Sequence, residues 1–173
     1  MLDKNLLLVD IGGTNIRYAY SNIGDSGFVS ENKAELDSLN DFDNLMSELI
    51  AEADVKNIVF SVAGPKVNNS IKMTNRNFEI DADEIRKKFN LESCYLLNDW
   101  ESIGYSIRTF SENDFDTFKE GEPFNDNFLV IGPGTGLGAS VISGNNVIAT
   151  EIGNTNLGSV SYTHLTLPTM DSV

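Results

Sequence analysis

Two glycine-rich turns have the composition of phosphate-binding loops. The first is Gly12-Gly13-Thr14 and the second is Gly132-Pro133-Gly134-Thr135-Gly136-Leu137-Gly138, and each lies between two apolar runs. Glycines have no side chain, so the backbone N–H groups of such turns can approach a bound anion. Either turn alone is compatible with an ordinary β-turn. Two of them in one chain predict two hairpins that face the same nucleotide phosphates.

Two other phosphate-binding motifs also contain glycine-rich turns. A P-loop is excluded because no Gly-Lys-Ser/Thr follows either turn. Residues 134–139 match the dinucleotide fingerprint G-x-G-x-x-A, but that fingerprint must open a helix. Residues 139–143 are short and rich in β-branched side chains, and Ser143-Gly144-Asn145-Asn146 follows them. This composition favours a hairpin over a Rossmann loop.

Polar residues at the ends of predicted strands are the candidates for acid–base and metal chemistry. Asp10 ends the first apolar run and could hold a hydrated metal ion, while Asn98 and Asp99 end another run. Ligands of α/β sheets bind beyond the carboxyl ends of strands, so these side chains are expected at one site. Asp99 could instead cap the helix that follows. The only histidine, His164, lies in the last ten residues, so a general base is expected to be a carboxylate.

Alternating strands and helices would position these residues. The expected helices contain residues 41–53, a segment after Asp81, which resembles a capping residue, and a segment with Trp100, Ile103, Gly104 and Ile107 on one face. Strands are expected over residues 6–11, 15–20, 27–31, 56–62, 70–75, 93–98, 128–131 and 139–143. This order predicts an α/β sheet covered by helices.

Composition narrows the functional classes. The chain has 173 residues, 40% of them apolar, and a formal charge of −14 that disfavours binding to nucleic acid or to an anionic membrane surface. It has neither an uninterrupted apolar run long enough for a membrane helix nor a signal-peptide layout, so a cytoplasmic protein is expected. The one cysteine, Cys94, excludes a disulfide framework and a thiolate metal site.

Five ordered segments resemble the bacterial glucokinase family. They are Asp10-Ile11-Gly12-Gly13-Thr14-Asn15-Ile16-Arg17, Val62-Ala63-Gly64-Pro65, Met73-Thr74-Asn75, Leu97-Asn98-Asp99-Trp100 and Gly132 to Gly138. The resemblance spans roughly residues 5 to 158 and implies ATP-dependent phosphorylation of glucose to glucose 6-phosphate. It also implies an actin-like, ribonuclease-H-like α/β fold of two domains that close on glucose and Mg-ATP. A homodimeric parent protein is a further expectation.

The resemblance also implies residue roles. Asp99 is similar to the catalytic base and Asn98 to a sugar ligand of the family. From its chemistry, Asp10 is expected to contact Mg²⁺ through water. The phosphate ligands implied are the first loop, Asp10, Ile11, Gly12, Gly13, Thr14 and Asn15, and the second loop, Gly134, Thr135 and Gly136. The chemistry agrees, because phosphoryl transfer to a hydroxyl needs a proton acceptor and charge neutralisation at the phosphates.

One sugar-binding segment departs from the family pattern. Glu151 resembles the acid of the family's Glu-Gly-Gly-His motif, but the segment here is Glu151-Ile152-Gly153-Asn154. The isoleucine is similar to that of the broader ROK sugar kinases, and Asn154 replaces the histidine as a candidate sugar ligand. An amide can still donate and accept hydrogen bonds.

The expected organisation has four parts. Residues 1–107 form a complete N-terminal α/β domain, residues 108–127 a linker, and residues 128–159 the start of a truncated second domain. Residues 160–173 are expected to be a non-native tail, since Val160 to Thr169 resembles the translation of a transposase sequencing adapter. The fragment alone is expected to be inactive.

The sequence is compatible with two alternative functions. One is a ROK-type kinase for another hexose or an amino sugar. The other is a non-catalytic, actin-like, sugar-responsive regulator, which would need the phosphate hairpins but not Asn98 and Asp99.

Overall fold

The structure is a computed structural model that describes residues 3–12, 15–35, 39–73, 79–122, 124–133 and 137–152. Its central feature is a five-stranded sheet with the strand order β3-β2-β1-β4-β8. The strands are β1 (Leu6–Ile11), β2 (Asn15–Ser21), β3 (Val29–Glu35), β4 (Asn57–Val62) and β8 (Ser93–Asn98). The first three form an antiparallel meander, whereas β4 and β8 run parallel to β1. Parallel neighbours need long crossovers, and helices lie in both of them.

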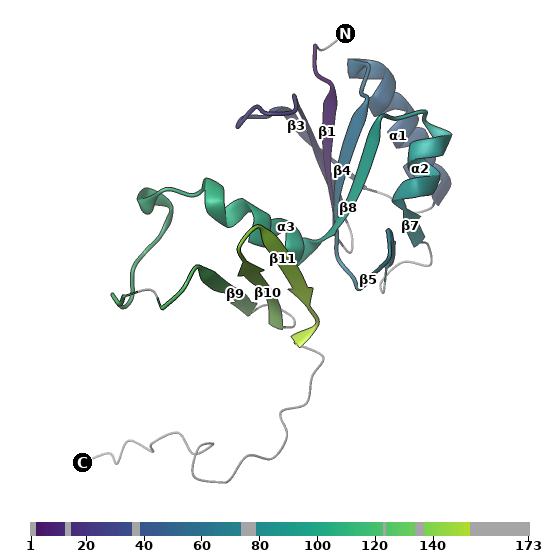
Figure 1. Ribbon diagram of the computed structural model, residues 1–173. Helices are drawn as coiled ribbons and strands as arrows, with labels where there is room; N and C mark the ends of the chain where they lie inside the picture. Colours follow the sequence, from purple (N-terminus) through teal and green to yellow (C-terminus); the bar gives the residue numbers. More distant parts are fainter. Residues whose placement is uncertain are drawn as a thin grey trace, which may run out of the picture.

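One face of this sheet carries the hydrophobic core. Helices α1 (Leu39–Ala53) and α2 (Ala82–Lys88) cover it (Figure 1). Alternate strand residues such as Val9 and Phe60 point into this core, where Phe60 packs against Phe42 of α1 with 6.0 Å between the ring centroids. Asp81 caps α2 as expected, because its side chain accepts from the backbone N–H groups of Asp83 and Glu84.

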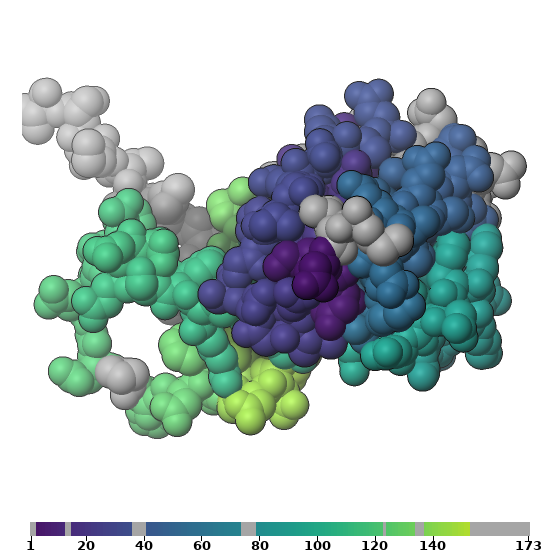
Figure 2. All heavy atoms as spheres, turned by 90° about the horizontal axis from the view of Figure 1, so that it is seen from above, coloured from purple at the N-terminus to yellow at the C-terminus, as the bar shows by residue number. Residues whose placement is uncertain are grey.

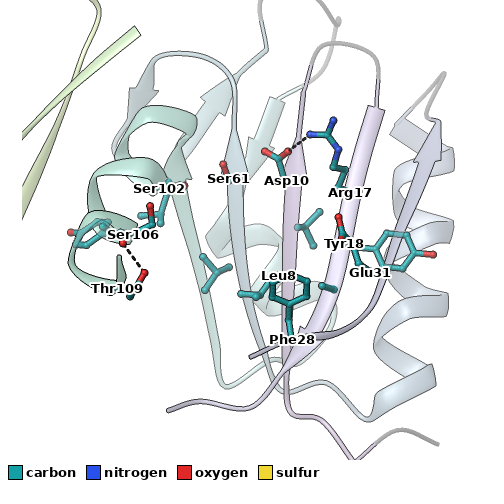
Figure 3. A pocket seen from close by; sticks show the side chains of 15 residues that line it. Leu8, Asp10, Arg17, Tyr18, Phe28, Glu31, Ser61, Ser102, Ser106 and Thr109 are labelled. Atoms are coloured by element: carbon teal, nitrogen blue, oxygen red, sulfur yellow. Dashed lines mark hydrogen bonds and ion pairs between the residues drawn. The ribbon is translucent and has the colours of Figure 1, made fainter. Parts of the chain in front are cut away.

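The opposite face of the sheet is only partly covered. It carries half-buried residues of β1, β4 and β8, among them Leu8, Val59 and Leu97. A cavity of about 570 Å³ lies between this face and the segment that includes α3 (Asp99–Ser106) and the 3₁₀ turn η1 (Ile107–Thr109). Figure 3 shows Asp10 and Ser61 on the sheet side of this cavity and Ser102, Ser106 and Thr109 on the helical side.

A second sheet follows α3 in the chain. It has the order β11-β10-β9, formed by β9 (Asn127–Pro133), β10 (Leu137–Ser143) and β11 (Asn146–Thr150). The strand β10 confirms that residues 139–143 do not open a helix, which removes the Rossmann alternative. Helix α3 lies along this sheet (Figure 1) and also contacts β4 and β8 of the five-stranded sheet. The domain boundary expected after residue 107 comes directly after this helix.

The remaining elements are short. The strands β5 (Lys66–Val67), β6 (Ser70–Lys72) and β7 (Glu79–Asp81) form a three-stranded sheet beside the start of α2. The 3₁₀ turn η2 (Glu112–Asp114) belongs to a segment that stands out to one side of the molecule (Figure 2). Among the described residues, no helix is long and apolar enough to cross a membrane.

Candidate functional site

Three strands bring the predicted polar residues to one edge of the five-stranded sheet. Ile11 of β1, Val62 of β4 and Asn98 of β8 are neighbours in the register, so the carboxyl ends of these strands are level. Asp10 lies one residue before this row and Asp99 one residue after it. Neighbouring strands are about 4.8 Å apart, so the backbones of β1 and β8 are separated by about 10 Å. The sequence-predicted placement of Asp10, Asn98 and Asp99 at one strand edge is therefore confirmed.

Asn98 is the residue that caps α3. Its Oδ1 accepts from the N–H groups of Trp100 at 2.9 Å and Glu101 at 3.3 Å, and its Nδ2 donates to the carbonyl oxygen of Gly64 at 2.8 Å. The residue is 4% exposed. The alternative that Asp99 is the helix cap is therefore wrong, because the extended backbone of Asn98 makes Asn98 the cap and Asp99 the first helical residue.

An ion pair between Lys66 and Glu101 supports the Asn98 cap. Glu101 Oε2 accepts from the backbone N–H of Asn98 at 3.1 Å, which completes a capping box. Lys66 Nζ of β5 donates to Oε1 and Oε2 of Glu101 at 3.2 and 3.0 Å. The two side chains are 29% and 12% exposed. Sequence reasoning missed both residues, although the spacing of Asn98 and Glu101 is that of a capping box.

Asp99 is left free of the capping role. One of its oxygens accepts from the N–H of Trp100 at 3.0 Å. Burial raises the pKa of the Asp99 carboxyl above its ordinary value, and the nearby charge of Asp10 raises it further, against backbone N–H donors that lower it. A carboxylate with a raised pKa is a better proton acceptor. This shift is compatible with a general base, and the role of Asp99 as the catalytic base stays a prediction.

Asp10 faces the partly covered side of the sheet. Its Oδ2 accepts from Nη1 of Arg17 at 3.4 Å across the β1–β2 pair (Figure 3), and its side chain is 48% exposed. No group of three or more His, Cys, Asp or Glu side chains that could hold a metal occurs in the part of the chain that the structure describes. A single exposed carboxylate such as Asp10 is compatible with Mg²⁺, which keeps several waters and uses one or two carboxylates together with substrate phosphates.

The first phosphate hairpin is described at both of its ends. Ile11 is fully buried in β1, and Gly12 donates its N–H to the carbonyl of Asn15 at 3.0 Å. A methyl group on Gly12 would lie 3.7 Å from that oxygen, which is an ordinary contact. Gly13 and Thr14 lie outside the described residues, and their role as phosphate ligands stays a prediction.

The other predicted ligands are close in sequence to strands of the second sheet. Strands β9 and β10 lead into and out of the second glycine turn, but Gly134, Thr135 and Gly136 lie outside the described residues. Glu151 follows β11 directly and is exposed, and Asn154 lies outside the described residues. The roles of these five residues as phosphate or sugar ligands stay predictions.

Comparison with known sequences shows one family over nearly all of the chain. A sequence model of the glucokinase family matches residues 7–169. The glucokinase of Nostoc punctiforme is 29% identical over 150 residues, which cover 82% of this chain and 44% of that protein. The glucokinase of Campylobacter jejuni is 30% identical over 143 residues, which cover 78% of this chain and 41% of that protein. The chain spans less than half the length of these curated relatives.

Comparison with solved structures supports the same fold. A glucokinase from an Antarctic psychrotroph has a TM-score of 0.73 at 25% identity, with 94% of this chain and 54% of that chain covered. A glucokinase from Balamuthia mandrillaris in complex with glucose has a TM-score of 0.67 at 21% identity, with 92% and 50% covered. A ROK-family glucokinase from Streptomyces griseus in complex with glucose and AMPPNP has a TM-score of 0.61 at 20% identity, with 83% and 46% covered. The predicted actin-like sugar-kinase fold is therefore confirmed.

Proposed function

Because the chain belongs to the glucokinase family, we propose that the full-length protein transfers the γ-phosphoryl group of ATP to glucose and releases glucose 6-phosphate and ADP. The observation that carries this proposal is Asp99, a carboxylate with a raised pKa at the strand edge where the first phosphate hairpin also begins. Two structural neighbours, one in complex with glucose and one in complex with glucose and AMPPNP, support the choice of substrates.

In the proposed reaction, Asp99 accepts the proton of the sugar 6-hydroxyl as that oxygen attacks the γ-phosphorus. The bond between the γ-phosphorus and the β,γ-bridging oxygen breaks, and ADP leaves with its electron pair. The Asn98 cap and the Glu101 side chain stabilise the first turn of α3, so the backbone that carries the Asp99 carboxylate is in place before the sugar arrives. In this proposal the amide of Asn98 would also contact the sugar.

The phosphate side of the reaction is assigned to the two hairpins and Asp10. Backbone N–H groups of the first hairpin and of the predicted loop at residues 134–136 would donate hydrogen bonds to the phosphate oxygens. Mg²⁺, when bound, neutralises charge on the β- and γ-phosphates. Asp10 would accept hydrogen bonds from water molecules of that ion, and Arg17 pairs with the Asp10 carboxylate.

A ROK-type kinase for another hexose or an amino sugar is the second candidate. Ile152 in Glu151-Ile152-Gly153-Asn154 is similar to the isoleucine of the ROK motif, whereas Asn154 departs from both patterns. A panel of glucose, mannose, N-acetylglucosamine and N-acetylmannosamine, each with ATP, separates the two candidates by kcat/KM. The cytoplasmic location, the homodimer, the division of the chain at residues 107, 127 and 159, and the foreign origin of residues 160–173 remain predictions.

Coupled detection of ADP in the full-length protein tests the proposal. Glucose should give the highest kcat/KM of the panel, and Asp99→Asn should lower kcat by about 10² to 10⁴ while the Kd for glucose changes little. Asp116→Asn is the matched control, because Asp116 is exposed. A wild-type protein without sugar-dependent ADP release, or an Asp99→Asn variant with wild-type kcat, would contradict the proposal.

A further inference from the structure

Trp100 connects the candidate base to the strands of the second glycine hairpin. It follows Asp99 directly, as the second residue of α3. Its indole lies on β9 and β10 so closely that a Cβ on Gly132 would be 1.9 Å from Cη2 of Trp100. A Cβ on Gly138 would be 1.7 Å from Nε1. Neither position has room for a side chain while the indole stays where it is.

The space taken by the indole, and not the backbone conformation, explains why glycine occupies positions 132 and 138. Gly132 and Gly138 are Cα partners across β9 and β10, so together they form one flat patch under the ring. Neither of them has a positive φ, so the backbone conformation would accept any L-residue. The pair therefore works as a slot, defined here as Gly132 and Gly138, that fits the Trp100 side chain.

A second contact holds the same face of α3 on this sheet. Gly104 is buried four residues after Trp100, and a Cβ on it would lie 2.5 Å from Cγ1 of Val147 and 2.8 Å from Oγ of Ser140. Residues four apart lie on one side of a helix. Helix α3 thus contacts the second sheet at two points, while its first turn is fixed to the five-stranded sheet through the Asn98 cap.

We propose that Trp100 is a positioning residue, which sets the place of the Asp99 carboxylate relative to the β9–β10 hairpin. The inference rests on the proposed function, which assigns proton transfer to Asp99 and nucleotide phosphates to that hairpin. Movement of the indole out of the slot moves the backbone of the adjacent Asp99. A displacement of about 1 Å from the reactive geometry can lower a rate by about 10²-fold. Binding of the sugar before reaction depends far less on this distance.

The test adds one methyl group to the slot. In the full-length protein, Gly132→Ala should lower kcat by about 10²-fold, while the Kd for glucose stays within about threefold and the far-UV circular dichroism is unchanged. Gly121→Ala is the matched control, because nothing lies within 4 Å of a Cβ at that glycine. The control should keep the wild-type kcat.

A compensating change distinguishes positioning from general damage. A phenylalanine ring is shorter than an indole and lacks Cη2, the atom that the Gly132 methyl group would meet. Gly132→Ala combined with Trp100→Phe should therefore recover at least about tenfold of the lost kcat. If Gly132→Ala does not fold, Trp100→Phe alone is decisive and should lower kcat by about tenfold at unchanged glucose Kd.

Three results with these variants would overturn the inference, and a different result would overturn the proposed function. Wild-type kcat in Gly132→Ala or in Trp100→Phe overturns the inference, and so does a double variant that is no faster than Gly132→Ala. Loss of glucose binding in parallel with kcat also overturns it, because the slot would then be merely structural. A wild-type protein that does not phosphorylate a sugar overturns the proposed function, and this result is distinct because it needs no variant.

Discussion

Replacing Asn98 by alanine removes three hydrogen bonds of one buried side chain. The amide oxygen accepts from the N–H groups of Trp100 and Glu101, and the amide nitrogen donates to the carbonyl of Gly64. Because the residue is 4% exposed, water cannot replace these partners without some opening of the site. Asn98→Ala is therefore expected to destabilise the fold and to loosen the first turn of α3.

The magnitude follows from the two kinds of bond. Loss of an N-cap side chain costs about 1 kcal/mol. Loss of the donor to the Gly64 carbonyl adds about 1 kcal/mol, so the free energy of unfolding should fall by about 2 kcal/mol. Since m is about 2 kcal/mol/M in urea for a chain of this size, the urea midpoint should fall by about 1 M.

Urea unfolding of the 173-residue chain, followed by circular dichroism at 222 nm, measures this change. Asn98→Ser is the matched control, because a hydroxyl can still cap the helix but does not reach Gly64. Its loss should be about 1 kcal/mol, half that of alanine. A serine variant as unstable as the alanine variant, or an alanine variant within about 0.5 kcal/mol of wild type, would refute the capping argument.

Three further predictions concern side chains around this site and the core. Burial raises the folded-state pKa of Asp99, so the ionised carboxylate opposes folding at pH 7. Asp99→Asn should therefore raise the urea midpoint at pH 7, and this gain should disappear below about pH 4. Equal gains at pH 7 and pH 3.5 would contradict the prediction. Lys66→Met should cost about 1 kcal/mol because its carboxylate partner is only 12% exposed, while Lys56→Met, at an exposed pair, should cost less than about 0.5 kcal/mol by the same urea assay. Burial raises the pKa of the Cys94 thiol to about 12, so a thiol reagent should react slowly with the native chain and rapidly in urea, and equal rates would show that Cys94 is accessible.

Local patterns in the sequence were sufficient for much of the fold. Apolar periodicity and turn composition, which act over a few residues, predict the β1–β2 hairpin, the strands β4, β8 and β10, and helix α1. The strand expected over residues 27–31 is instead β3, Val29–Glu35, whose residues are almost all exposed. A polar edge strand has no buried face, so its sequence carries no alternation that could reveal its ends.

The site was predictable to the extent that it depends on strand ends. Asp10, Asn98 and Asp99 lie within one residue of the carboxyl ends of β1 and β8, and parallel strands of a sheet carry their carboxyl ends at the same edge. The division of roles within Asn98-Asp99 was not predictable, since both residue types cap helices well. The tertiary structure decided it, because Asn98 also donates to Gly64 and is buried there, which leaves the Asp99 carboxylate available.

Contacts between residues far apart in the chain could be found only in three dimensions. Lys66 and Glu101 are separated by 35 positions, and neither belongs to a motif that predicts the other. The sequence of the second turn marks Gly132 and Gly138 as glycines of a phosphate hairpin, but it does not contain the reason for their missing side chains. That reason is the indole of Trp100, which the packing of α3 places on β9 and β10, and close packing of this kind depends on the whole fold rather than on any local pattern.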